Sequence, residues 1–471
     1  MNAISLKVTR TLAELGPRFL PFADAATPDL PLSRLLRLSL FQVSVGMALV
    51  LLVGTLNRVM IVELKVPASL VAIMLSLPVL YAPFRAMVGH RSDNHRSELG
   101  WRRVPYIWMG TLVQFGGLAV MPFALLVLSG MGNASQWPSW VGPAGAGIAF
   151  LLVGAGLHTT QTAGLALATD LAPVESQPKV VGLMYVMLLA GTIVSALLFG
   201  ALLEDFSPGR LVQVIQGSAV VTMILNTIAL WKQETRRPAR FIKATAQAPQ
   251  TFRESWMKFI EGGRAVRRLT AIGLGTMAFS MQDVLLEPYG GQILHMSVGA
   301  TTSLTATLAL GGLVGFSLAS NVLSRGADPF KMAGTGAMVG IPAFALVIVS
   351  ASAFGSVLLF TLGALLVGFG AGLFGHGTLT ATMNSAPKDQ TGLAMGAWGA
   401  VQATAVGVAT AAGGIMNDTV AAFAARGAFG PSLSGPTSGY LFVYSVEIIL
   451  LACTMFIMST LQRGARPRQE R

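Results

Sequence analysis

The chain has 471 residues, of which 53% are hydrophobic and 11% are charged, whereas charged residues make up about 25% of a typical soluble domain. We therefore predict a membrane protein. Its one cysteine, Cys453, excludes an intramolecular disulfide and a metal centre built from several cysteines. A formal charge of +12 would suit nucleic-acid binding, but the basic residues lie mainly in the tails and loops between apolar segments. We therefore expect no nucleic-acid partner.

Residues 1–38 form a basic segment that four prolines interrupt, without a continuous apolar stretch before a small-residue cleavage site. We expect no cleavable signal peptide in this segment. Val8, Leu12 and Leu15 share one face of a short helix whose other positions are partly basic. This pattern predicts an amphipathic helix that lies on the membrane surface.

Twelve apolar segments follow, each long enough to supply the roughly 20 residues that a membrane-spanning helix needs. In chain order, as spans 1 to 12, they lie near residues 39–62, 68–89, 104–128, 144–169, 181–203, 211–231, 268–290, 301–323, 332–353, 355–383, 391–416 and 438–461. An even number of spans places both termini on the same side of the membrane.

The positions of Lys and Arg predict the orientation of these spans. Most of them lie in the N-terminal segment, in the loops after even-numbered spans and in the C-terminal tail. The opposite side has Lys65, Arg210 and Arg426, while Arg58 and Arg85 fall within spans. By the positive-inside rule, the basic side, which includes both termini, faces the cytoplasm.

A polar linker joins two halves of six spans each. Thr251 and Glu254 form a capping box in this linker, and Phe252, Trp256 and Phe259 recur at helical spacing. This pattern predicts a helix lying on the inner leaflet, with a plain linker as the alternative. The expected organisation is an N-terminal segment (1–38), an N-terminal half (39–231), the linker (232–267), a C-terminal half (268–461) and a basic tail (462–471).

The two halves resemble each other in sequence. A glycine-rich span 4, from Gly154 to Pro173, matches span 10, from Gly368 to Pro387, at the same internal spacing. Two six-span halves with an internal repeat are the layout of the major facilitator fold, in which the substrate site lies between the halves. We therefore predict an all-α membrane protein with twelve transmembrane helices and a major facilitator-like fold.

The loop between spans 2 and 3 combines two glycines, an aspartate and an arginine pair. It is similar to the cytoplasmic signature of major facilitators, although the aspartate and the arginines are farther apart here. Such groups can lock the cytoplasmic ends of neighbouring spans through charge-assisted hydrogen bonds. The alternative is positive-inside charge alone. The residues of this gate motif are Gly89, Asp93, Gly100, Arg102 and Arg103.

Spans 1 and 7 each carry an amide residue, then a charged residue, then a glutamate. We expect Arg58 and Asp283 to meet across the interface between the halves, because an unpaired charge inside a membrane is costly. The pair is either structural or part of the polar wall of a ligand cavity, and Arg85 in span 2 is a further charge-pair candidate. The two sets are Asn57, Arg58 and Glu63 in the first half and Gln282, Asp283 and Glu287 in the second.

His158 in span 4 and His376 in span 10 are candidate ligands for a metal centre, because a neutral imidazole is a good axial ligand. Neither has a second metal-ligating residue at i+3 or i+4, so we expect no protein-only metal site. The magnesium of a tetrapyrrole needs only one axial ligand. The alternative is a histidine hydrogen-bonded inside the bundle. No phosphate-binding loop or nucleophile elbow has supporting context, so ATP hydrolysis is not expected.

Several long phrases resemble one family, the PucC/LhaA group of major facilitator-like proteins of photosynthetic bacteria, also called the bacteriochlorophyll delivery family. The resemblance covers about residues 31–461, and GPRFLPFADAA (16–26) favours the LhaA branch, which is associated with the core antenna. The phrases are LFQVSVGMALVLLVGTLNRVMIVEL (40–64), VPASLVA (66–72), APFRAMVGHRSD (82–93), LGWRRVPYIWMGTLVQFGGLA (99–119) and FSMQDVLLEPYGGQ (279–292).

The resemblance implies a non-enzymatic assembly factor for light-harvesting complexes in the photosynthetic cytoplasmic membrane. Its implied cofactor is bacteriochlorophyll, with His158, His376, Asn57 and Gln282 as candidate contacts. The implied partners are antenna polypeptides and reaction centre–antenna assembly intermediates, with bacteriochlorophyll synthase and the membrane insertion machinery as further partners. The alternatives are a proton-coupled secondary transporter of a small amphipathic solute, which fold analogy favours, and an inert scaffold.

Overall fold

The computed structural model contains helices and connecting segments, and the residues that it describes form no strand. It describes residues 26–27, 30–81, 85, 88, 92, 100–130, 136–173, 176–234, 264–352, 355–385, 391–430 and 435–465. The expected surface helix near Val8–Leu15, the linker helix near Thr251, and the motif residues Gly89 and Asp93 lie outside these ranges.

Within these described ranges, eleven helices are long and apolar enough to cross a membrane, and the shorter apolar helix Ala68–Val79 lies where span 2 is expected. The predicted all-α membrane fold is therefore confirmed. The elements are α2 (Leu32–Leu38), α3 (Leu40–Leu49), η2 (Val50–Leu56), η3 (Val59–Glu63), α4 (Ala68–Leu80), α6 (Val104–Leu128), α7 (Val141–Leu171), α8 (Gln177–Leu202), α9 (Pro208–Leu230), α11 (Arg264–Ser280), η7 (Met281–Val284), α12 (Leu286–Gln292), α13 (Val298–Ser324), α14 (Pro329–Ser352), α15 (Val357–Ser385), α16 (Thr391–Ala425) and α17 (Thr437–Ala465).

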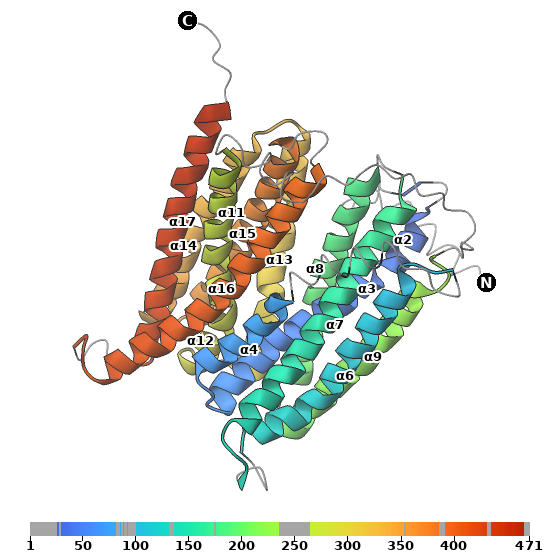
Figure 1. Cartoon of the computed structure of the whole chain (residues 1–471). Helices are drawn as coiled ribbons and strands as arrows, with labels where there is room; N and C mark the ends of the chain where they lie inside the picture. Colours follow the sequence, from blue (N-terminus) through green and yellow to red (C-terminus); the bar gives the residue numbers. More distant parts are fainter. Residues whose placement is uncertain are drawn as a thin grey trace, which may run out of the picture.

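The helices form two groups, α2–α9 and α11–α17, which stand side by side (Figure 1). We call the end of the bundle that contains the loops after odd-numbered spans the Arg58 end, and the opposite end, from which the linker leaves, the linker end. The ribbons of the two groups converge at the Arg58 end, at the bottom of Figure 1, and diverge toward the linker end.

Span 1 is a continuous helical segment from Leu32 to Glu63, seven residues longer at its start than the sequence predicts. The extra turns form because Leu35 and Leu38 are fully buried against the neighbouring helices of the N-terminal half. Toward the Arg58 end the segment widens into two stretches of π-helix, η2 and η3, on either side of Asn57 and Arg58. Such wide turns are rare and are frequently found at functional sites.

Glycines allow the two halves to approach closely. A Cβ added to Gly299 of α13 would lie 2.4 Å from the backbone oxygen of Gly200 in α8, and one added to Gly414 of α16 would lie 2.7 Å from that of Ala68 in α4. Small residues at helix contacts are the usual means of close packing in membranes. The α8–α13 and α4–α16 contacts therefore form the core of the interface between the halves.

Candidate functional site

The polar group in span 1 connects the two halves through Asn57. This side chain is fully buried, and its Nδ2 donates hydrogen bonds to the backbone oxygens of Asp283 (3.2 Å) and Val284 (3.1 Å). These carbonyls are available because span 7 breaks here from α-helix into the 3₁₀ turn η7. In this conformation Asn57 is a contact between the halves, and its expected role in pigment binding stays a prediction.

Arg58 does not form the expected ion pair with Asp283. Its Nη1 lies 2.5 Å from Glu63 Oε1, and its Nη2 donates to the backbone oxygen of Met296 at 3.2 Å. Glu63 is the nearer partner because the π-turn η3 brings it back beside Arg58, five residues earlier. The charge on Arg58 is thus neutralised within span 1, while its second hydrogen bond reaches the C-terminal half.

Glu287 lies in the same contact region and is only 4% exposed. Its Oε1 accepts a hydrogen bond from Thr305 of α13, and Arg58 acts on it electrostatically. A Cβ added to Gly54 would lie 2.7 Å from Glu287 Oε1, so a side chain at residue 54 would require the carboxyl group of Glu287 to move. The two glutamates singled out in the sequence therefore flank Arg58 from different halves.

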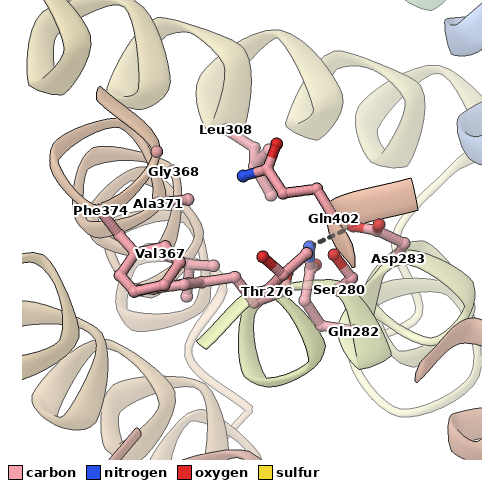
Figure 2. A pocket seen from close by; sticks show the side chains of 12 residues that line it. Thr276, Ser280, Gln282, Asp283, Leu308, Val367, Gly368, Ala371, Phe374 and Gln402 are labelled. Atoms are coloured by element: carbon pink, nitrogen blue, oxygen red, sulfur yellow. Dashed lines mark hydrogen bonds between the residues drawn. The ribbon is translucent and has the colours of Figure 1, made fainter. Parts of the chain in front are cut away.

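A cavity of about 210 Å³ lies in the C-terminal half, beside η7 (Figure 2). Gln282 and Asp283 are at its polar end, where Gln282 Nε2 donates to Asp283 Oδ1 at 2.6 Å. Phe374 closes the apolar end. Pockets for drug-sized ligands measure roughly 300–1,000 Å³, so this cavity suits a small group or a substituent rather than a whole macrocycle.

Glu447 in α17 is a buried carboxyl group that the sequence reading missed. It is fully buried, and no side chain among the described residues donates a hydrogen bond to either carboxylate oxygen. Tyr444, one turn earlier, packs edge-on against Tyr289 at a centroid separation of 5.6 Å, and its hydroxyl has no partner in the described part of the chain. The available signal was a glutamate inside the apolar run of span 12.

Arg85 is held by neutral groups of α7 rather than by a carboxylate. Its Nε donates to Thr162 Oγ1 at 3.1 Å and its Nη2 to Gln161 Oε1 at 3.2 Å. Gln161 in turn donates to Gln42 Oε1 of α3 at 3.3 Å, which fixes the direction of its amide. The expectation that Arg85 takes part in an ion pair is therefore not met among the described residues.

The two intramembrane histidines lie in different halves, and both are half-buried. His158 is on α7 and His376 on α15, where its ring packs edge-on against Phe316 at 4.3 Å. In each, Nδ1 is buried and has no hydrogen-bonding partner among the described residues. The alternative of a histidine fixed by hydrogen bonds inside the bundle therefore finds no support at Nδ1 of either ring.

At the linker end, Arg103 holds the start of α6 to the end of α7. Its Nε lies 2.9 Å from Asp170 Oδ2, and its Nη1 donates to Ser92 Oγ at 2.6 Å. Glu234 accepts from the backbone N–H groups of Arg102, Arg103 and Val104, where a carboxylate also interacts favourably with the helix dipole. Arg103 of the gate motif thus makes a charge-assisted contact with Asp170, a residue outside the motif, and the lock through Asp93 stays a prediction.

The hydrogen bonds that join described residues across the two halves all lie at the Arg58 end. Besides the contacts of Asn57 and Arg58, the backbone N–H of Ser69 donates to Asp418 Oδ2 at 2.7 Å. Asp418 of α16 thereby caps the N-terminus of α4, whose own flanking residue, Pro67, supplies no side-chain cap. The described contacts are those of a molecule closed at the Arg58 end.

Comparison with known proteins finds a family model and relatives that match most of the chain. The family model described as "PUCC protein" matches residues 55–465. Protein PucC of Rhodovulum sulfidophilum is 64% identical over 89% of this chain and 92% of its own length. Protein PucC of Cereibacter sphaeroides is 57% identical over 98% of both chains. A more distant relative, named the 44.5 kDa chain of bacteriochlorophyll synthase in Rhodobacter capsulatus, is 27% identical over 79% of this chain and 85% of its own length.

Solved transporter structures share the fold at low sequence identity. A bacterial homologue of the human lysosomal transporter Spinster, inward-facing and unoccupied, matches with a TM-score of 0.68 at 14% identity, covering 93% of this chain and 98% of that one. An inward-facing bacterial homologue of the iron transporter ferroportin gives 0.64 at 15% identity, covering 92% and 98%. These likenesses show the fold alone, and they confirm the predicted major facilitator-like architecture.

Proposed function

This chain belongs to the PucC family, and from that membership we propose that it assists the assembly of photosynthetic light-harvesting complexes. In this proposal it binds bacteriochlorophyll and delivers it to antenna polypeptides as they insert into the membrane. The chain acts as a binding protein and not as an enzyme. Its partners are antenna polypeptides and reaction centre–antenna assembly intermediates, with bacteriochlorophyll synthase and the insertion machinery as further partners.

The observation that carries the proposal is the match to the PUCC family model over residues 55–465, which takes in every span except residues 32–54 of span 1. The name of the 27% identical relative from Rhodobacter capsulatus supports a link to bacteriochlorophyll. The preference for the LhaA branch stays a prediction, since the most similar relatives quoted above carry the PucC name. The proposal therefore covers both core and peripheral antennae.

The residues present fit a magnesium tetrapyrrole at the level of single ligands. His158 and His376 are half-buried, and the Nδ1 of each lacks a hydrogen bond within the described chain. An imidazole that the protein does not already use can supply the one axial ligand that the magnesium of such a pigment takes. Gln282 is at the polar end of the 210 Å³ cavity, which has room for a substituent of the macrocycle.

The proposed location is the cytoplasmic photosynthetic membrane of a bacterium, with both termini in the cytoplasm. The excess of Lys and Arg on the side of the termini and linker supports this orientation. The linker end would then face the cytoplasm and the Arg58 end the opposite side. Labelling the thiol of the exposed Cys453 does not test the orientation, because this residue lies within a span. A tag at either terminus, digested by protease from one side of sealed vesicles, tests it directly.

Deleting the gene in its photosynthetic host tests the proposed function. The near-infrared absorption of the antenna should fall, while wild-type protein restores it and the His158→Ala, His376→Ala double variant restores it only in part. Immunoblots must show equal amounts of both proteins in the membrane. Normal antenna absorption in the deletion strain would refute the proposed function. Full restoration by the double variant would refute only the role of the histidines.

Transport of a small amphipathic solute is the second candidate function. The observation that favours it is the likeness to transporters together with contacts of a state closed at one end. Proteoliposomes that contain the purified chain should show no uptake dependent on a proton gradient if the assembly function is correct. Uptake without any copurifying pigment would favour the transporter.

A further inference from the structure

Arg85 is a positive charge in the interior of the N-terminal half that no carboxylate of the described residues neutralises. Its two hydrogen-bonding partners, Thr162 and Gln161, are neutral. Two ionisable side chains interact electrostatically with Arg85, Tyr185 of α8 and His158 of α7. Neither carries a negative charge at neutral pH. Charged groups inside membrane proteins face the bundle interior or a cavity and pair with one another or with backbone carbonyls, so an anionic ligand is a fitting partner for Arg85.

The geometry of the guanidinium leaves one complete binding edge free. Thr162 and Gln161 occupy Nε and Nη2, which together form the side edge of the group. The end edge, formed by Nη1 and the second hydrogen of Nη2, makes no hydrogen bond or ion pair with a described residue. Two parallel N–H groups on such an edge match the two oxygens of a carboxylate. Because Gln42 fixes the amide of Gln161, the guanidinium is held in one orientation before any ligand arrives.

The imidazole of His158 lies near enough to Arg85 for the guanidinium to act on it electrostatically. His158 precedes Gln161 and Thr162 by three and four residues, which places the three side chains on one face of α7, about 5.4 Å or one helical turn apart. Gln161 is ten residues from Leu171, the last residue of α7, and therefore roughly 15 Å from the linker end of that helix. One ligand that enters between the halves from the linker end can reach both groups.

We propose that Arg85 binds a free carboxylate of a tetrapyrrole whose magnesium faces His158. This inference rests on the proposed function, because it takes the ligand to be a pigment. The proposed ligand is a magnesium tetrapyrrole whose propionic acid side chain is a free carboxylate. The pigment that carries a long-chain ester at this position lacks the negative charge that would pair with Arg85. Thr162 and Gln161 are positioning residues, since they orient the guanidinium without touching the ligand.

The test compares two ligands with the same macrocycle, bacteriochlorophyll and the free acid made by hydrolysing its long-chain ester. Each is titrated into the purified full-length protein in nanodiscs of zwitterionic lipid, and binding is followed by the shift in pigment absorption. We expect the free acid to bind at least about tenfold more tightly, the factor for one charge-assisted interaction. Arg85→Gln should bind both forms equally, and Arg85→Lys should lose most of the preference because it lacks the paired edge.

Arg210→Gln is the matched control, because it removes the same charge from an exposed position at the Arg58 end and should leave the preference unchanged. Equal binding of acid and ester to the wild-type protein would overturn the inference and leave the proposed function standing. Binding of neither form would overturn the proposed function. An acid preference that persists in both Arg85→Gln and Arg85→Lys would also overturn the assignment of the carboxylate to Arg85. If Arg85→Gln does not fold, Arg85→Lys and Thr162→Val decide, and both should show a reduced preference.

Discussion

Replacement of Asn57 by alanine should weaken the closed contact at the Arg58 end. The side chain is fully buried, and its Nδ2 donates to two backbone oxygens of η7 in the opposite half, at 3.2 and 3.1 Å. Its Oδ1 has no partner in the described part of the chain, so alanine removes two donor contacts and no acceptor contact. The variant should therefore favour conformations in which the halves separate at this end.

The expected size follows from the two hydrogen bonds. Each contributes about 1 kcal/mol net, so their loss should cost the closed conformation about 2 kcal/mol relative to an open one. A free-energy change of 1.4 kcal/mol is a factor of ten, so the ratio of open to closed molecules should rise roughly 30-fold. A minor open population of a few per cent in the wild type would become a large one.

Pulsed electron spin resonance between two spin labels measures this change. Cys453 is the only cysteine, so Cys453→Ser provides a background without reactive thiols. Trp137→Cys and Phe429→Cys then place labels on exposed loop positions of different halves at the Arg58 end, where these residues are 53% and 47% exposed. Asn57→Ala should add a population at longer distance.

Asn226→Ala is the matched control for the loss of a buried amide. Asn226 is also fully buried, but it bonds to Thr111 and Ser44 within the N-terminal half. It should lower the thermal stability without changing the distance between the halves. If Asn57→Ala folds and gives the wild-type distance distribution, Asn57 does not help to hold the halves together.

Three further predictions concern the interface, the linker end and the pigment. Gly299→Ala should destabilise the closed state, because its Cβ would lie 2.4 Å from a backbone oxygen. The control Gly116→Ala, whose Cβ would meet nothing within 4 Å, should be neutral or stabilising. The spin-label distances described above check both variants. Arg103→Gln should lower the free energy of unfolding by about 1–3 kcal/mol, because it leaves Asp170 without this cation. The melting temperature of the detergent-purified protein measures this loss, and an unchanged value would show that the Arg103–Asp170 contact contributes nothing to stability. His376→Ala should reduce the pigment that copurifies with the chain, measured by absorption after extraction, and unchanged pigment in this variant would remove His376 as a ligand.

The fold was predictable because each membrane-spanning helix corresponds to a long apolar run in the sequence. Composition, the count of such runs and the repeat around Gly154 and Gly368 were enough to predict two halves of six helices. The start of span 1 was not, because Leu32–Leu38 contains two arginines and becomes a helix of the bundle only through the burial of Leu35 and Leu38. Tertiary packing decided that boundary.

The sequence identified polar residues of the candidate site but did not identify their bonding partners. Asn57 does contact the backbone of span 7 at Asp283, whereas Arg58 reaches the C-terminal half at Met296. The expected Arg58–Asp283 pair does not form, because the π-helical turns of span 1 return Glu63 to Arg58. A reading based on the regular α-helical period has no means of placing such turns. Glu447 was missed for a different reason, since it has no counterpart in the first half.

The neutral surroundings of Arg85 could not be inferred from sequence either. Its partners lie on α7, more than seventy residues away, and only the packing identifies them as the neutral residues Thr162 and Gln161. This contact replaces the expected ion pair with hydrogen bonds to two neutral side chains. The structure therefore changes which groups we expect Arg85 to bind.

The most direct test of the central claim is to purify the tagged chain from pigmented membranes of its photosynthetic host and record the absorption spectrum and the protein composition. The same tag on an unrelated membrane protein of similar abundance gives the background. Our account predicts bacteriochlorophyll bound above that background, together with antenna polypeptides. Purified protein that carries neither pigment nor antenna polypeptide above background would contradict it.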